Sequence, residues 1–214
     1  QDNAIVFANV TEVKLPETTA YFLKLAELIN KDLHLIGYEY CPAEMMASNP
    51  KWCLSLDEWK NAISKWVVSP GGDEVLASSI FFDFNHVYGD STLTSSLSDH
   101  IFDSIKKHPV FYAHLASGAL QNPSPTGFFR QFLLEEDGAQ KDLFDLKRRA
   151  LRPLTEAARV LILSHEIKSI NNTSERFEKL AELEPNNEEI YLACSYAFKA
   201  LSKFRAKQGL LHND

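Results

Sequence analysis

The chain has 214 residues, of which 45% are hydrophobic and 24% charged, and its formal net charge is −7 at pH 7. These proportions are ordinary for a folded protein with a substantial core, whereas the acidic balance argues against nucleic acid as a partner, because nucleic-acid binders usually carry a basic stripe. The sequence has no apolar run of about 18 residues and no signal peptide, so we expect no membrane partner.

The first predicted elements are a strand at residues 4–7 and a long helix after Pro16. Asp2 stands directly before the strand. The helix, of about 18 residues, has one apolar face and ends at Gly37, because glycine readily adopts the left-handed conformation that terminates many helices. Its apolar face comprises Phe22, Leu25, Ala26, Ile29, Leu33 and Ile36. Residues 38–40 are predicted to form a further strand, which a proline soon ends.

A loop and a capped helix come next. Residues 45–52, which include Asn49, show neither helical nor strand periodicity. Ser55 is predicted to cap the following helix, and Glu58 at the third helical position completes a capping box. The buried stripe of this helix comprises Trp59, Ile63, Trp66 and Val67.

Residues 79–85 are predicted to form a buried strand that carries Asp83 among large apolar side chains. A carboxylate in such a place is costly to bury unless it is paired, hydrogen-bonded or held by a metal ion. Two interpretations stay open: a carboxylate at the strand rim that is hydrogen-bonded to a loop, or a metal ligand. In the second, Asp2 and Asp83 would lie on adjacent strands, roughly 4 to 6 Å apart, and share one divalent cation.

Helices dominate the sequence after residue 90. Their predicted positions are residues 93–105, 110–120, 154–163, a helix capped at 172–173, and 188–207. Because strands and helices alternate before this point, the sequence predicts an α+β fold, with an α/β domain at residues 1–90 and an all-helical domain at residues 91–214.

A basic run interrupts the acidic chain at residues 147–152, where four cations occur within six residues. Clustered lysine and arginine before a helix can hold phosphate groups by charge and by paired hydrogen bonds. The alternative is a solvated loop tied to Asp142 and Asp145. Composition favours neither interpretation.

Six segments carry a resemblance to a known family. They are Gln-Asp-Asn-Ala-Ile-Val-Phe at 1–7, Met-Ala-Ser-Asn-Pro-Lys-Trp-Cys at 46–53, Ser-Ile-Phe-Phe-Asp-Phe at 79–84, Val-Tyr-Gly-Asp at 87–90, Thr-Gly-Phe-Phe at 126–129 and Asp-Leu-Lys-Arg-Arg-Ala-Leu-Arg-Pro-Leu at 145–154. In this order they resemble the nucleotidyltransferases related to the N-terminal region of the protein-PII uridylyltransferases. The resemblance spans nearly the whole chain.

The resemblance implies a nucleotidyltransferase-fold domain, truncated at its N-terminus, that binds a nucleoside triphosphate and Mg²⁺ against the helical domain. Asp2 matches the second acid of the family's Asp-x-Asp pair and Asp83 its third carboxylate, both as catalytic metal ligands. The first acid and a Gly-Ser phosphate grip would precede Gln1, so we expect residues 1–214 alone to be inactive. Lys147 and Arg148 are expected to face the nucleotide cleft, and Asn49 is a weaker candidate for nucleotide contact.

Two classes of function follow. One is a signal-transduction enzyme that transfers UMP or AMP to a protein hydroxyl, such as that of a PII-like acceptor, or to a small molecule, under control of cyclic-nucleotide-binding and CBS domains upstream in the same chain. The other is a degenerate, non-catalytic regulatory or interaction module. Three widely spaced cysteines, Cys41, Cys53 and Cys194, predict neither disulfides nor a zinc site and favour a cytoplasmic location.

Overall fold

The computed structural model describes residues 1–121, 134, 144–168 and 170–212, which fall into two compact units. The first unit comprises residues 1–69 and 86–104, and the second comprises residues 70–85 and those from 105 onward. The described residues are predominantly helical and include one two-stranded parallel sheet, which is compatible with the predicted α+β class. The predicted division at residue 90 into catalytic and helical domains stays a prediction, because compactness alone does not define a functional domain.

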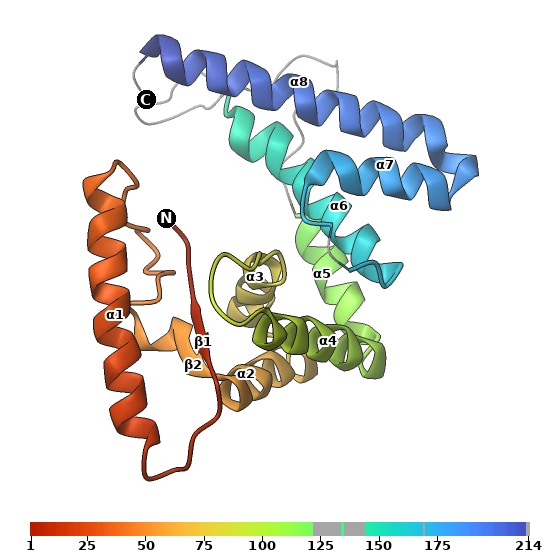
Figure 1. Cartoon of the computed structure of the whole chain (residues 1–214). Coiled ribbons are helices and arrows are strands. Elements are labelled where there is room, and N and C mark those ends of the chain that lie inside the picture. The colour runs from red at the N-terminus through yellow and green to blue at the C-terminus, as the bar shows by residue number, and fades with distance from the viewer. Residues whose placement is uncertain (122–133, 135–143, 169, 213–214) are drawn as a thin grey trace. The chain divides into compact units, whose positions relative to one another are not determined.

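The sheet of the first unit joins β1 (Ile5–Phe7) to β2 (Cys53–Ser55), with Ile5 opposite Cys53 and Phe7 opposite Ser55. Figure 1 shows the two strands side by side. The strand at β1 was predicted, whereas β2 was not, because three residues are too few to show an alternating pattern.

Helix α1 (Leu15–Leu35) ends where the sequence predicts, and no strand follows it at residues 38–40. Gly37 has a φ of +107°, and the N–H of Tyr38 donates to the Leu33 carbonyl at 3.0 Å, so these residues close the last turn of the helix. The strand predicted at residues 38–40 is therefore wrong: this backbone follows the helix cap without regular structure.

Helix α2 (Leu56–Val68) has the predicted capping box and follows the short 3₁₀ helix η1 (Pro50–Trp52). The Ser55 hydroxyl accepts from the Glu58 N–H at 3.4 Å, and Glu58 Oε2 accepts from the Ser55 N–H at 2.9 Å. Trp59, Ile63 and Val67 form the buried stripe of this helix. Helix α4 (Ser91–Lys107) contributes residues up to 104 to the same unit.

The strand predicted at residues 79–85 is wrong. Helix α3 (Gly72–Phe81) occupies its first half, and Phe82 and Asp83 form a turn behind it. Phe81 and Phe82 are buried whereas Ile80 is 38% exposed, and a short continuous apolar run cannot be assigned to strand or helix by periodicity alone. Asp83 therefore stands in a turn that follows a helix.

The second unit continues as a series of helices. After α3 they are α5 (Val110–Leu120), the π-helical turn η2 (Lys147–Leu151), α6 (Arg152–Ser164), α7 (Thr173–Leu183), the 3₁₀ turn η3 (Pro185–Asn187) and α8 (Glu188–His212). Figure 1 shows α7 and α8 packed side by side. The predicted helices at these places are confirmed, as is the Asn172 cap, whose Oδ1 accepts from the N–H groups of Ser174 and Glu175.

One hydrophobic cluster of this unit lies among α6, α7 and α8. Its buried members are Ala158, Ile162, Phe177, Leu180, Ala181 and Tyr191. These residues recur every three or four positions on α6 and α7, which is the spacing that places side chains on one helical face. Burial of this shared face holds the three helices together.

A polar contact reinforces this core where α7 meets η3. The Glu184 carboxylate accepts from Asn187 Nδ2 at 2.7 Å and from Tyr191 Oη at 2.8 Å, and it lies 2.6 Å from His165 Nε2. The hydrogen bonds from Asn187, Tyr191 and His165 lower the pKa of Glu184 from 4.5 to about 2. Because the folded-state pKa is lowered, the stabilisation is complete above the ordinary value and disappears as the pH falls toward 2.

We therefore expect Glu184→Gln to lower the melting temperature at neutral pH and to lose this effect in acid. The measurement is thermal unfolding of wild type and variant at a series of pH values. The gap between their melting temperatures should stay constant above pH 4.5 and close as the pH approaches 2. Glu182→Gln, which alters an exposed carboxylate on the same helix, is the control. A gap that persists at the acid end would contradict the prediction.

Candidate functional site

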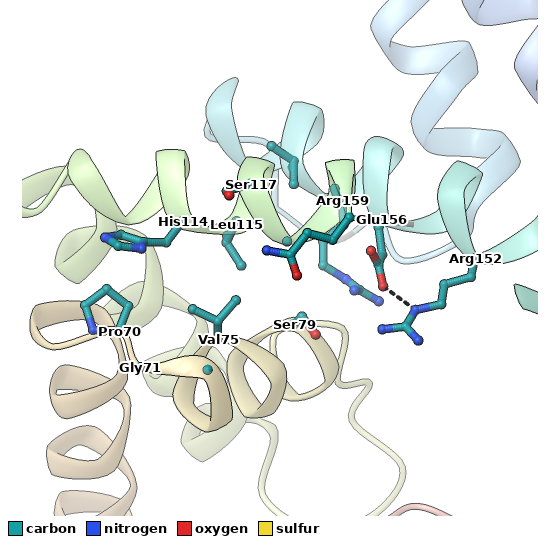
Figure 2. Close-up of a pocket in the computed structure, with 15 residues that line it drawn as sticks. Pro70, Gly71, Val75, Ser79, His114, Leu115, Ser117, Arg152, Glu156 and Arg159 are labelled. Carbon is teal, nitrogen blue, oxygen red and sulfur yellow. Dashed lines mark hydrogen bonds and ion pairs between the residues drawn. The ribbon is translucent and has the colours of Figure 1, made fainter. Parts of the chain in front are cut away.

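A pocket of about 300 Å³ lies in the second unit, lined by the start of α3 and by residues of α5 and α6. Figure 2 shows Val75 and Ser79 on α3 facing side chains of α6 across this space. Val75, Leu115 and Val160 give the pocket apolar walls. A concave, partly apolar cavity with a few polar groups is the usual form of a small-molecule site, and this volume is at the small end of the range.

The charged groups of the pocket come from α6. Arg152, Glu156 and Arg159 all line it, and Arg152 Nε donates to Glu156 Oε1 at 2.7 Å. The spacings of four and three residues place these side chains on neighbouring positions of one helical face. Two guanidinium groups and one carboxylate of α6 thus line the pocket.

Arg159 is held in place by Asp83. Its Nε and Nη2 donate to Asp83 Oδ2 at 2.8 and 2.5 Å. The other carboxylate oxygen, Oδ1, accepts from Arg176 Nη2 at 2.6 Å. One acid at the end of α3 therefore links an arginine of α6 to an arginine of α7.

The second arginine is the more deeply buried. The side chain of Arg176 is 3% exposed, compared with 11% for Arg159 and 19% for Asp83. Arg176 Nε donates to the Ile170 carbonyl at 2.7 Å, whereas its buried Nη1 has no hydrogen-bond partner. Two cations thus share one carboxylate, and the cluster as a whole carries an excess positive charge.

The charge of Asp83 is fixed by these neighbours. Burial would raise its pKa, but the hydrogen bonds and charges of Arg176 and Arg159 outweigh burial and hold the pKa below its ordinary value. Asp83 is therefore an anion throughout the neutral range, with both oxygens engaged by guanidinium groups.

This arrangement does not suit magnesium at Asp83. Mg²⁺ is bound through carboxylate oxygens and water in near-ideal octahedral geometry, and both oxygens of Asp83 already accept hydrogen bonds from arginine. The assignment of Asp83 as a catalytic metal ligand stays a prediction that these contacts do not favour. Within the described residues, no three histidine, cysteine or acidic side chains gather closely enough to hold a metal ion.

Asp2 is exposed in the first unit, next to a buried amide cluster. Asn3 Oδ1 accepts from Asn30 Nδ2 at 3.1 Å and from the Ala47 N–H at 2.9 Å. Asn30, which is 2% exposed, accepts from the Ser48 N–H at 3.2 Å. These contacts join β1 to α1 and to the loop after residue 45. Asp83 lies in a turn after α3, so the expected placement of Asp2 and Asp83 on adjacent strands is wrong, while their sharing of one cation stays a prediction.

The other predicted contact residues have the following positions. Asn49 caps η1, accepting from the Lys51 N–H at 3.1 Å and donating to the Glu44 carbonyl at 3.1 Å. Lys147 and Arg148 are exposed at the start of η2 and do not line the pocket. Their roles in nucleotide binding stay predictions. The Thr-Gly-Phe-Phe segment and Asp142 lie outside the described residues.

Two charged residues of this region, Arg159 and Arg176, were not predicted from the sequence as site residues. Arg159 lies between the apolar residues Ala158 and Val160, and Arg176 lies four positions before the buried Leu180, on the same face of α7. A cation in such a pattern is a signal for a buried acid elsewhere in the chain, and Asp83 supplies that acid.

No described helix combines the length and apolar character that a membrane span needs. Cys41, Cys53 and Cys194 are free thiols. Searches of curated proteins and of solved structures found no match.

Family models do match the chain in two places. The model described as "Putative nucleotidyltransferase DUF294" matches residues 1–73, and the model described as "Putative nucleotidyltransferase substrate binding domain" matches residues 109–213. The α5 and α6 walls of the pocket lie inside the second match. Because the two matches follow one another along the chain and together span most of it, the chain belongs to the nucleotidyltransferase family that both descriptions name.

Proposed function

We propose that the chain functions as a module of a nucleotidyltransferase, which transfers UMP or AMP from a nucleoside triphosphate to a hydroxyl group. The observation that carries this proposal is the pair of family matches, since one of them describes a substrate binding domain and includes most of the pocket walls. In this reaction the acceptor oxygen attacks the α-phosphorus, a new phosphorus–oxygen bond forms, and pyrophosphate leaves with the bridging oxygen. The hydroxyl proton passes to a base or to solvent.

The finer parts of the proposal rest on the resemblance to the PII uridylyltransferases. They are a nucleotidyltransferase fold around β1 and β2, a PII-like protein or a small molecule as the acceptor, regulatory domains upstream in the same chain, and a cytoplasmic location. Mg²⁺ is the proposed cofactor, which would neutralise the charge of the triphosphate when bound. Because both oxygens of Asp83 accept hydrogen bonds from arginine, the magnesium proposal rests on the resemblance alone.

A second candidate function is a non-catalytic regulatory or interaction module that keeps the family fold. The ion pairs of Asp83 favour it, because a carboxylate engaged by two guanidinium groups acts as a structural link between helices. Both candidates retain the pocket. They differ in whether a nucleotidyl group is transferred.

Transfer of label from α-³²P-labelled UTP or ATP distinguishes the two candidates. The intact gene product is incubated with Mg²⁺ and cell extract, and labelled protein or small molecule is detected by electrophoresis and chromatography. We expect a labelled product with one of the two nucleotides. Absence of any labelled product from the intact protein would favour the non-catalytic module.

A further inference from the structure

We propose that the pocket lined by α3, α5 and α6 binds the phosphate group of a small phosphorylated molecule, with Arg159 as the residue that contacts it. The choice of a phosphate ester among anions rests on the proposed function. The presence of an anion site rests on the charges and contacts around the pocket, which are independent of that function.

The first argument is the positive charge at the pocket. Arg152 and Glu156 neutralise each other, whereas Arg159 shares Asp83 with Arg176. Among the described residues, two guanidinium groups face one carboxylate, which leaves one positive charge without a counterion in a partly buried place. This occurs in a chain whose net charge is −7, so an electropositive pocket is not a consequence of overall composition. A buried excess charge is costly unless an anion neutralises it.

The second argument is the unused hydrogen-bonding capacity of the two arginines. Arg159 gives Nε and Nη2 to Asp83, and its Nη1 has no partner among the described residues. Arg176 Nη1 is buried and also without a partner. Of the two arginines only Arg159 lines the pocket, so its Nη1 is the donor that an acceptor in the pocket can reach, while the unsatisfied Nη1 of Arg176 shows that the cluster behind the pocket wall lacks an acceptor. Guanidinium groups match the oxygens of phosphate especially well.

The third argument is preorganisation. Asp83 holds Arg159 by two hydrogen bonds to a single carboxylate oxygen, and Arg176 holds the other oxygen. Asn171 Nδ2 also donates to the Phe84 carbonyl at 2.8 Å, which fixes the backbone next to Asp83. The guanidinium of Arg159 is therefore oriented before a ligand arrives, which lowers the entropic cost of binding. Asp83 acts here as a positioning residue.

The size of the pocket limits the ligand. About 300 Å³ with walls of Val75, Leu115 and Val160 accommodates a phosphate with a modest organic body, such as a nucleoside monophosphate. A folded protein segment would need a far larger surface. The ligand class is thus a small phosphate ester, whether a nucleotide or another phosphorylated substrate.

The test measures binding of UMP, AMP and inorganic phosphate to the intact chain by titration calorimetry. Two variants address the pocket. Arg159→Gln removes the contacting cation, and Ser117→Phe fills the pocket from α5 without altering the arginines. Arg205→Gln removes an exposed positive charge on α8 and is the matched control. Circular dichroism checks that each variant is folded.

We expect at least one phosphate compound to bind the wild type, about tenfold or more weaker binding to both pocket variants, and unchanged binding to Arg205→Gln. If inorganic phosphate binds as tightly as the nucleotides, the phosphate group alone is the ligand. Failure of all three compounds to bind at millimolar concentration, or wild-type binding by both pocket variants, would overturn the proposal. Label transfer that is unaffected by the pocket variants would overturn the pocket's role while leaving the transferase function intact.

Discussion

Replacing Asp83 with alanine is expected to lower the free energy of unfolding of the second unit by about 3 kcal/mol. The variant leaves Arg159 and Arg176 close together without the carboxylate that both contact. Removal of one partner from a buried ion pair is costly because the remaining charge is desolvated and unpaired. Since Asp83 is 19% exposed, water can reach part of the gap, and we place the loss at the lower end of the range for such changes.

Urea denaturation measures this loss, and hydrogen exchange locates it. Exchange should increase in α6 and α7, which carry the two arginines, and stay unchanged in β1 and α2 of the first unit. Asp83→Asn is the informative comparison, because its amide keeps one acceptor but turns a donor toward arginine, so it should be destabilising as well. An Asp83→Asn variant as stable as wild type would show that the ion pairs contribute little, and would reopen the metal-ligand interpretation.

Trp59→Ala is expected to have an equal or larger effect on the first unit. Trp59 is 0% exposed, and its Nε1 donates to the Ile5 carbonyl at 2.9 Å, so one side chain both fills the core and fastens α2 to β1. Truncation leaves a large cavity and an unsatisfied backbone carbonyl. Losses for such aromatic residues are about 3 to 5 kcal/mol.

The control for this prediction is Trp59→Phe, which keeps most of the apolar volume and removes only the indole N–H. We expect about 1 to 2 kcal/mol of destabilisation from it, the cost of the lost hydrogen bond and a small cavity. Chemical denaturation followed by circular dichroism suits all variants, because Trp52 and Trp66 lie close to Trp59 and their fluorescence would change for reasons besides unfolding. Equal stability of Trp59→Ala and Trp59→Phe would contradict the assigned role of the side chain.

Local signals predicted the helices well. Each helix end is determined by residues close to it in sequence: the Ser55 capping box, the Asn172 cap and Gly37. Such ends can be predicted from the sequence because the interacting groups lie within a few residues of one another. The periodic apolar stripe of α2 is similarly local. These features explain why helix positions could be read before the structure was known.

The strands were harder to predict because their causes are distant in sequence. β2 exists only because β1 pairs with it across 48 residues, and its three residues carry no pattern of their own. The run Ile80-Phe81-Phe82 has strong strand propensity, yet it lies at the end of α3, because strand propensity depends on the packing environment. Asp83 was correctly singled out as an acid that requires a partner, but the partners are arginines 76 and 93 residues away.

The same distance limited prediction of the site. The basic run at residues 147–152 was selected for phosphate binding, and its last member, Arg152, does line the pocket. Arg159 lies beyond that run, and although its apolar neighbours Ala158 and Val160 indicate a buried cation, they do not identify the acid that pairs with it. Only the folded arrangement of α3, α6 and α7 brings Asp83, Arg159 and Arg176 together.

The amide cluster of Asn3 and Asn30 has a consequence for solution conditions. Amide groups neither titrate nor carry net charge, so the hydrogen bonds that join β1, α1 and the following loop are insensitive to acid and only weakly affected by salt. The second unit depends instead on carboxylates, at Asp83 and Glu184, that acid neutralises. Progressive acidification should therefore loosen the contacts among α3, α6 and α7 while the start of β1 stays anchored.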